Sequence, residues 1–254
     1  MAGRQSKSNI SSERRAALDA GEIEAATLTE CLAVDFTALL PRVVPDMDPN
    51  AIDRMRDASA LGITRRMALA ADLLIRHSGG VSVTRLQAHP SDTVRGWAAY
   101  MAGARPNLSL AQKIAAIAPF ADDGHFGVRE WAWLAVRPDI AGDIHTAIEI
   151  LTPWTVSDSA NLRRFATEAT RPRGVWCAHI GALKQDPEPG RPLLEALKAD
   201  PARYVQDSVG NWLNDASKDR PDWVRTLCAR WSVEEPSRET ARIIGRGLRT
   251  LTRS

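Results

Sequence analysis

The sequence predicts an all-α fold, an α-solenoid of paired helices, and three observations carry this prediction. Apolar residues recur at helical spacing through most of the chain, whereas strands of alternating polarity joined by hairpin turns are absent. Short turn-forming stretches divide the chain into many short amphipathic segments. One segment pattern also repeats along the chain, as expected of stacked helix pairs.

Helix boundaries are expected where proline, glycine and aspartate cluster. Proline cannot continue a helix without losing a hydrogen bond, and the other residues favour turns. Each cluster is followed by an amphipathic stretch. The clusters are PDMDPN, HPSD, RPN, ADDG, RPD, TPW, DPEPG, KADP, DRPD and EEPSRE.

The repeat is anchored on Val94, Val128, Leu162 and Val205. The first two intervals are 34 residues (94 to 128 and 128 to 162), and the third is 43 residues (162 to 205). After each of the first three anchors, apolar residues follow at the fourth and seventh positions, which lie on one face of a helix. This spacing predicts a buried face in each repeat.

Repeats of this kind resemble HEAT repeats, whose stacked helix pairs expose a concave inner surface. In this register Gly96, Glu130, Arg164 and Asp207 are equivalent, and so are Arg95, Arg129, Arg163 and Gln206. If the second helix of each pair lines the concave side, charged residues of successive repeats face one groove. The alternative is that these charges only solvate the inner face.

Composition and length set limits on the class of protein. The 254 residues, 44% hydrophobic and 25% charged, are enough for a sizeable core. We expect residues 1–12 to form a disordered tail and residues 13–254 to form a single domain. No apolar run reaches the roughly 18 residues of a membrane span, and the N-terminus lacks a secretory core. We therefore expect a cytoplasmic protein, and we expect it to be a monomer.

Three cysteines, Cys31, Cys177 and Cys228, are far apart and odd in number, which argues against a disulfide framework. No zinc-binding spacing is present, although Cys177 and His179 lie two positions apart. We expect no metal and no cofactor.

Positive charge is concentrated in the second half of the chain. From Asn161 onward there are 17 Lys and Arg against 12 Asp and Glu, whereas the first 160 residues have 16 against 19. An anionic partner is therefore expected to bind the second half. Four arginines lie between Ser157 and Trp176, interleaved with Phe165 and Trp176: Arg163, Arg164, Arg171 and Arg173. Guanidinium groups beside aromatic rings suit phosphates and unstacked bases, although pairing with Glu168 and Asp158 is a nearly equal alternative.

The last segment predicts a basic helix. Its arginines at positions 238, 242, 246, 249 and 253 would form one stripe, with Arg242 and Arg246 as candidate phosphate contacts. The apolar face with Ile243, Ile244, Leu248 and Leu251 would dock on the end of the solenoid.

The stretch SVGNWLNDASKDRP, residues 208–221, places Asn211, Asn214 and Asp215 among the apolar residues of a predicted helix. A carboxylate and two amides in these places suggest a polar site. On the residues alone, local bonding of Asp215 to Ser217 or Lys218 at a helix end is the simpler interpretation.

Three longer strings carry a family resemblance: NLRRFATEATRPRGVW, LLEALKADPARYVQDSVGNWLNDASKDRPDWV and TARIIGRGLRTL, with AATLTECLAVDF earlier in the chain. Together they resemble the bacterial DNA alkylation repair enzymes, the HEAT-like-repeat alkylpurine DNA glycosylases of the AlkC and AlkD type, and most closely the AlkC branch. The resemblance covers most of the chain. Departures are Gly174 and Val175 before Trp176, and Trp212 where the family usually has a histidine.

The resemblance implies a monofunctional glycosylase that removes cationic alkylated bases of the 3-methyladenine class from double-stranded DNA, without metal or cofactor. It places the catalytic carboxylates on Glu130 and Asp215, and the aromatic residue near the lesion on Trp176. Candidate DNA contacts are Arg164 and Lys218, with Asn211 and Asn214 on the matched helix. A cationic base leaves without protonation, so a carboxylate that stabilises the oxocarbenium-like sugar is the main chemical requirement.

Two other functions remain open on the sequence. One is a non-catalytic HEAT-like protein that recognises damaged or branched DNA through its arginines. The other is a protein-interaction scaffold, which the basic second half disfavours.

Overall fold

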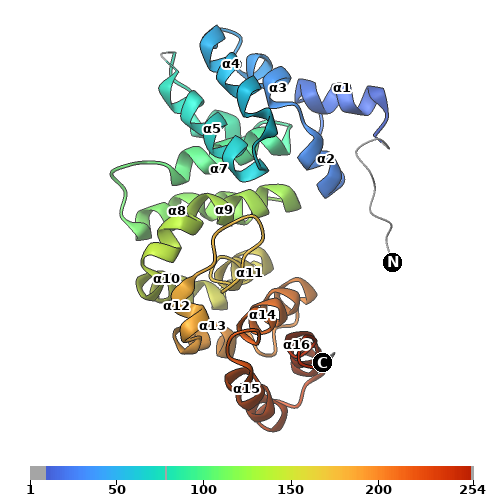
Figure 1. The fold of residues 1–254 in the computed structure, drawn as a ribbon, viewed down its shortest axis with the longest axis vertical. Helices are drawn as coiled ribbons and strands as arrows, with labels where there is room; N and C mark the ends of the chain where they lie inside the picture. The colour runs from blue at the N-terminus through green and yellow to red at the C-terminus, as the bar shows by residue number, and fades with distance from the viewer. Residues whose placement is uncertain (1–9, 78, 253–254) are drawn as a thin grey trace. The chain divides into compact units, whose positions relative to one another are not determined.

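The computed structural model describes residues 10–77 and 79–252. Within these residues every regular element is a helix and there is no strand, which confirms the predicted all-α class (Figure 1). The first helix, α1 (Ser12–Ala20), begins after Ser11, whose hydroxyl accepts a hydrogen bond from the amide of Arg14. Residues 1–9 of the expected tail lie outside the described residues, and the tail stays a prediction.

The chain divides into two compact units: unit 1 contains residues 1–108 and 116–135, and unit 2 contains residues 109–115 and 136–254. The single domain from residue 13 to residue 254 stays a prediction. The helices α8 (Leu110–Ala121) and α9 (Phe126–Gly142) each have residues in both units.

Unit 1 is built from short helices that pack on apolar faces. Its largest buried side chains include Trp97, Trp131 and Trp133. Besides its parts of α8 and α9, it contains α1, α2 (Leu28–Ala33), α3 (Phe36–Val43), α4 (Pro49–Asp57), the 3-10 helix η2 (Ala58–Ala60), α5 (Ile63–Arg76), α6 (Val83–Gln87) and α7 (Asp92–Gly103).

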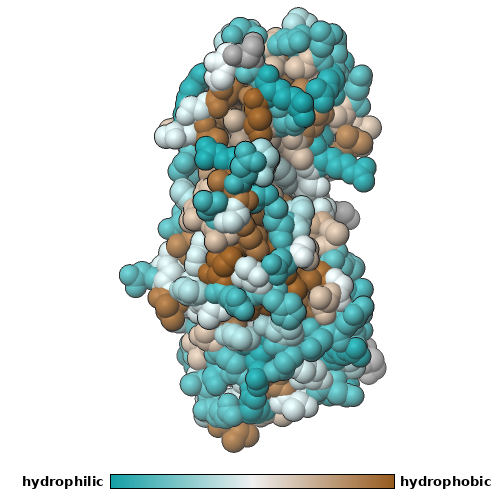
Figure 2. All heavy atoms as spheres, turned by 90° about the vertical axis from the view of Figure 1, so that its left-hand side faces the viewer, coloured by the Kyte–Doolittle hydropathy of each residue, from teal (hydrophilic) through white to brown (hydrophobic). Residues whose placement is uncertain are grey.

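Unit 2 ends in three longer helices, and the part of Figure 2 that they occupy, at the bottom of the view, is mostly hydrophilic. Its core includes Phe165, Trp212 and Trp231. Besides its parts of α8 and α9, it contains α10 (Ile144–Leu151), η3 (Thr152–Val156), α11 (Ala160–Glu168), α12 (Gly181–Gln185), η4 (Glu188–Gly190), α13 (Arg191–Ala196), α14 (Arg203–Ala216), α15 (Pro221–Glu234) and α16 (Arg238–Gly247).

The predicted repeat is confirmed in the helices. Each anchor is the third residue of a helix: Val94 in α7, Val128 in α9, Leu162 in α11 and Val205 in α14. The predicted apolar faces are buried, except that Leu162 and Ala135 are only half-buried. The preceding helices α6, α8, α10 and α13 complete the pairs.

One predicted boundary is wrong. The RPD stretch at residues 137–139 does not end a helix, because α9 continues through Pro138 to Gly142. Proline lacks an amide hydrogen, but a helix can pass through it with a local bend when its neighbours hold it.

The side chain directly after each anchor residue stabilises the turn that precedes its helix by hydrogen bonds to the backbone. The side chains of Arg95, Arg129 and Arg163 each donate to the carbonyl oxygens six and five residues earlier, at 2.7–3.1 Å. Gln206 does the same in α14, to Asp200 at 2.8 Å and Pro201 at 3.4 Å. These groups therefore satisfy turn carbonyls, and their expected place in a groove stays a prediction.

Two of these arginines also bind an aspartate in the turn before the next anchored helix, and in each case both residues lie in the same unit. Arg95 Nε lies 2.9 Å from Asp123, whose carboxylate accepts from the amide of His125. Arg163 Nε lies 2.6 Å from Asp200, whose carboxylate accepts from the amide of Ala202. The arginine–aspartate pair thus links one repeat to the following one.

Candidate functional site

The helix α14 carries polar side chains on two faces, and each face has a different neighbour. Towards α16 and the residues that follow it, α14 presents Asp207, Asn211 and Asn214. Towards α11 and the loop that follows it, α14 presents Tyr204, Ser208 and Asp215. Trp212 lies between these faces in the core, and its indole donates to the carbonyl of Thr170 at 3.1 Å. The apolar seam that the sequence predicts is therefore flanked by polar contacts on both sides.

Asn211 and Asn214 accept hydrogen bonds from the C-terminal segment of the chain. Asn211 Oδ1 accepts from Arg246 Nε and from Arg249, both at 3.0 Å. Buried Asn214 accepts from the hydroxyl of Thr250 at 2.8 Å. Arg242 pairs with Asp207 at 2.7 Å. Three arginines of the predicted stripe therefore lie against α14, and the phosphate contacts expected of Arg242 and Arg246 stay a prediction.

Glycines allow α14 and α16 to approach closely. A methyl group at Gly210 would lie 2.8 Å from Cβ of Arg246, and one at Gly247 would lie 2.9 Å from Cβ of Leu213. Both distances are shorter than real contacts, so the close packing needs glycine at each position.

The face towards α11 forms a buried network of charges. Glu168 accepts from Ser208 at 2.7 Å and from Arg171 at 2.7 Å, and Arg164 lies 3.5 Å from it. The guanidinium of Arg164 also stacks over the ring of Tyr204, 4.7 Å from the ring centre. The alternative pairing of Arg164 and Arg171 with Glu168 is thus confirmed.

Asp215 stands at the end of this network with its two oxygens in different surroundings. Its side chain is buried, with 2% of the residue exposed. Oδ2 is bound by Nε and Nη2 of Arg171, at 2.8 and 2.7 Å. Oδ1 has one charged neighbour among the described residues, Nζ of Lys218, at the longer distance of 3.4 Å. Arg171 therefore fixes the carboxylate through one oxygen and leaves the other less occupied.

The charges of the network stabilise one another. Burial raises the pKa of Glu168, but Arg164, Arg171 and the Ser208 hydroxyl outweigh it and hold this pKa below its ordinary value. Burial lowers the pKa of Arg171, yet Glu168 and Asp215 raise it above its ordinary value. Glu168 and Arg171 therefore stay ionised at neutral pH, and Arg171 is shared between two carboxylates.

Trp176 lies on the loop of residues 170–179, which connects α11 to α12 and is called the Trp176 loop below. Its backbone has a φ of 61°, in the left-handed region that non-glycine residues rarely adopt, and 42% of the residue is exposed. Val175 beside it is also exposed. Arg173 anchors the loop to Asp219 through contacts of 2.9–3.1 Å. The loop that carries this exposed apolar tip therefore also carries Arg171 of the charge network.

Arg137 of α9 is a buried residue of this region that sequence reasoning missed. Its guanidinium donates to the carbonyls of Ala169 at 2.7 Å, Arg171 at 2.6 Å and Ala178 at 3.4 Å. Burial lowers its pKa. The RPD stretch predicts a helix break at Pro138, whereas α9 continues through it and buries Arg137.

Glu130 lies in unit 1, on α9, and is half-buried. Its Oε2 accepts a hydrogen bond from the indole of Trp133, one helical turn later, at 2.8 Å. This contact orients a carboxylate on the surface of α9.

The other predicted contact residues have the following surroundings. Arg163 is engaged in the turn and in Asp200, as described above, and only 13% of its side chain is exposed. Lys218 is exposed and has Asp215 as its partner. The structure therefore brings Asp215, Arg171, Arg164 and Lys218 together, and uses Arg163, Asn211, Asn214, Arg242 and Arg246 in contacts between helices.

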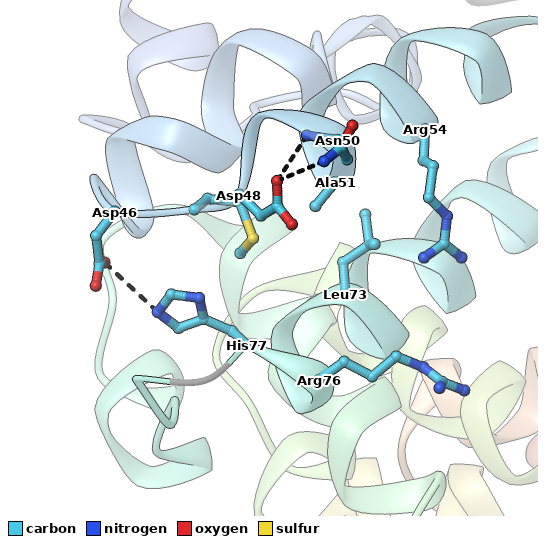
Figure 3. A pocket seen from close by; sticks show the side chains of 9 residues that line it. Asp46, Asp48, Asn50, Ala51, Arg54, Leu73, Arg76 and His77 are labelled. Atoms are coloured by element: carbon cyan, nitrogen blue, oxygen red, sulfur yellow. Dashed lines mark hydrogen bonds and ion pairs between the residues drawn. The ribbon is translucent and has the colours of Figure 1, made fainter.

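A separate cavity of about 320 Å³ lies in unit 1 between α4 and the end of α5 (Figure 3). Its polar groups bind one another or nearby residues. Asp48 accepts from the amide and side chain of Asn50 at 2.9 and 3.1 Å, His77 faces Asp46 at 3.5 Å, and Arg76 binds Asp72 at 2.6 Å. The residues that line this cavity satisfy helix ends and ion pairs, and none is a predicted site residue.

The described part of the chain contains no group of three or more His, Cys, Asp or Glu side chains arranged to hold a metal ion. None of its helices combines the length and the apolar character of a membrane span. All three cysteines are free.

No protein-family model matches the sequence. The uncharacterized protein YhaZ of Bacillus subtilis is 41% identical over 117 residues, which cover 46% of this chain and 32% of YhaZ. This similarity is local and covers less than half of either protein.

Solved structures share the fold. The Pseudomonas fluorescens alkylpurine DNA glycosylase AlkC, bound to DNA containing an abasic site analogue, matches with a TM-score of 0.69 and 24% identity. The match covers 97% of this chain and 64% of the AlkC chain. AlkD2 of Streptococcus mutans matches with a TM-score of 0.52 and 22% identity, over 82% of this chain and 95% of AlkD2. The protein smu.31 of the same species matches with a TM-score of 0.54 and 22% identity, over 83% of this chain and 96% of its own. The chain therefore has the all-α, HEAT-like fold of these proteins.

Proposed function

We propose that this protein is a DNA glycosylase that excises cationic N-alkylated bases, of the 3-methyladenine class, from double-stranded DNA. The observation that carries the proposal is a buried aspartate, Asp215, fixed through one oxygen by Arg171 beside the exposed Trp176 loop, in a fold shared with a DNA-bound alkylpurine glycosylase. The fold alone does not determine an activity, so the chemistry of these side chains has to support it.

The chemistry requires stabilisation of positive charge on the sugar. An N3-alkylated adenine is already cationic, so the glycosidic bond breaks without a general acid, and charge builds up on the deoxyribose. A fixed carboxylate near that charge lowers the barrier by roughly 3 to 4 kcal/mol, or about a hundredfold to a thousandfold in rate. In this account Oδ1 of Asp215 faces the sugar, because Oδ2 is bound to Arg171.

Arg171 keeps the carboxylate in place while Glu168 reduces its neutralising effect. Arg171 shares its charge between Asp215 and Glu168. A guanidinium paired with a single aspartate would cancel more of the charge that the reaction needs. Glu168 is therefore a positioning residue in this proposal, acting through Arg171.

Trp176 supplies the aromatic surface for the damaged base. A cationic ring over an indole gains roughly 0.5 to 2 kcal/mol, which neutral bases do not gain. Glu130 is proposed as the second carboxylate, on the family resemblance alone. Lys218 and Arg173 are proposed as phosphate contacts, whereas Arg163, Arg242 and Arg246 are assigned to contacts between helices.

The second candidate function is a non-catalytic DNA-binding protein that recognises damaged or branched DNA. The pairing of Asp215 with Arg171 and Lys218 favours it, since a fully neutralised carboxylate would be structural. The two functions differ in whether a free base is produced.

The test is the release of bases from methylated double-stranded DNA by the purified protein. We expect free 3-methyladenine and an abasic site, with no release of a neutral lesion such as hypoxanthine. DNA binding without any free base supports the non-catalytic function, and equal release of neutral lesions contradicts the proposed charge mechanism.

A further inference from the structure

A single guanidinium holds both ends of the Trp176 loop. Arg137 donates to Ala169 and Arg171 where the chain enters the loop, and to Ala178 where it leaves. The amide of Ile180 bonds to the carbonyl of Pro172 at 3.0 Å and closes the loop. The forked donors of arginine can bridge two strands of backbone in this way, whereas the single ammonium of lysine cannot do so with the same geometry.

Stability alone is a poor explanation for this arginine. Arg137 is 2% exposed, its guanidinium donates to three backbone carbonyls and interacts with the Cys177 thiol, and its Nε has no hydrogen-bond partner among the described residues. A buried charge without a bonded carboxylate carries a large desolvation cost, which a methionine of similar length would avoid. What methionine lacks is the set of donors that fixes the loop.

The loop needs such fixing because its tip is strained. A non-glycine residue in the left-handed region costs of order 1 kcal/mol or more, and it persists only where its surroundings hold it. Trp176 adopts this conformation with much of its indole exposed. Without ties at its two ends, the loop would relax and the indole would take other orientations.

We propose that Arg137 is a positioning residue that fixes the Trp176 loop and thereby presents the indole of Trp176 to the cationic base. This inference rests on the proposed glycosylase function. Arg137 would then contribute to the selectivity for the charged base without contacting the DNA or the sugar.

The experiment compares the wild type with Arg137→Met and Arg137→Lys. Release of base from methylated DNA is measured in single turnovers with the protein in excess, and affinity is measured on DNA with an abasic-site analogue. We expect Arg137→Met to lose about tenfold or more in release rate with affinity within about threefold, and Arg137→Lys to lie between. Hydrogen exchange of the Ile180 amide should be faster in Arg137→Met, because its bond to Pro172 depends on the closed loop.

A double-mutant cycle separates positioning from general destabilisation. If Arg137 acts through the indole, Arg137→Met should cause little further loss of rate in a Trp176→Ala background. Additive losses overturn the proposal, as does an unchanged release rate in a folded Arg137→Met variant. If Arg137→Met does not fold, the same cycle is run with Arg137→Lys, and the same outcomes decide.

The matched control is Arg66→Met. Arg66 of α5 is another arginine whose Nε is buried without a partner and whose pKa is lowered by burial, but it lies in unit 1 over the ring of Phe36. We expect it to leave release rate and Ile180 exchange unchanged. A wild-type protein that releases no base contradicts the proposed function, and Ile180 exchange then still decides whether Arg137 fixes the loop.

Discussion

Lys218 is the one charged neighbour of Asp215 Oδ1 in the described chain, and its side chain is exposed to solvent. A DNA phosphate that binds Lys218 would therefore break its ion pair with Asp215, and the negative charge of Asp215 would be less neutralised. Substrate binding and activation of the carboxylate would then be coupled at one residue.

This coupling predicts the behaviour of Lys218→Gln. We expect the slope of log affinity against log salt to fall by about 0.9, the loss of one phosphate contact. The single-turnover release rate at saturating protein should not decrease, because glutamine neutralises Asp215 less than lysine does. An unchanged salt slope together with a tenfold slower release contradicts this role.

Glu168 makes acid stability depend on the charge network. Its pKa is lower in the folded protein than in the unfolded chain, so the unfolded chain binds more protons as the pH falls. The stabilisation from its ionised form is complete above the unfolded pKa of about 4.5 and is lost as the pH falls through the lowered folded value. Stability should therefore rise with pH across this window.

Urea unfolding between about pH 3 and pH 7 tests the assignment. We expect Glu168→Gln to be less stable than the wild type at neutral pH, with a flatter loss of unfolding free energy on the acid side. Glu13→Gln is the control, because Glu13 is exposed on α1 and has no described partner. If the unfolding free energy falls equally steeply with decreasing pH in the wild type and in Glu168→Gln, other carboxylates determine the acid dependence of stability.

Helix α16 packs closely on α14, and one glycine from each helix separates the effect of packing from the effect of helix propensity. A methyl group at Gly210 of α14 meets the Arg246 side chain, whereas one at Gly245 meets nothing within 4 Å. Overpacking costs about 1–3 kcal/mol, and alanine in place of a helical glycine gains roughly 0.5–1 kcal/mol.

We therefore expect Gly210→Ala to lower the free energy of unfolding and Gly245→Ala to raise it slightly, both measured by urea denaturation. The opposite order, or equal effects, contradicts the tight contact between α14 and α16.

The arginines that follow the first three anchors have a structural role in the repeats, and Arg163 allows this role to be tested. Breaking a largely buried ion pair by removing one partner costs about 3 kcal/mol. Arg163→Met should lower unfolding free energy by this order and leave DNA affinity within about threefold, because Arg163 is engaged by Asp200 and turn carbonyls. Arg203→Gln is the control, since Arg203 is exposed on α14 and no partner is described for it. A large loss of DNA affinity in Arg163→Met, at unchanged stability, would restore the DNA contact that the sequence suggested.

At the scale of the whole chain, periodicity was sufficient to predict the all-α class and the repeat, because apolar spacing directly determines which helix face is buried. The roles of polar residues were not predictable in the same way. Asn211, Asn214 and Asp215 lie within five positions of one another in α14. The two amides accept hydrogen bonds from α16 and the residues after it, whereas the aspartate binds Arg171 in the loop after α11. Which neighbour packs on which face is a tertiary fact that local sequence does not contain.

The roles of the arginines were likewise not predictable from local sequence. Arg163 and Arg164 are adjacent, yet one fastens a turn and the other joins the charge network. Arg137 was hidden by Pro138, because a proline is more often a helix end than a point inside a helix that its neighbours support. Composition could indicate an anionic partner, but not which cations remain available to it.

In the proposed mechanism Asp215 provides the negative charge that drives base release. Single-turnover release of 3-methyladenine by Asp215→Asn, beside the wild type and Asp207→Asn, measures this role. Asp207→Asn is the same change on the same helix, but Asp207 faces the arginines of α16. We expect release to be about a hundredfold or more slower for Asp215→Asn at similar DNA affinity, and to change within about threefold for Asp207→Asn. A folded Asp215→Asn protein that releases base at the wild-type rate would rule out this role of Asp215.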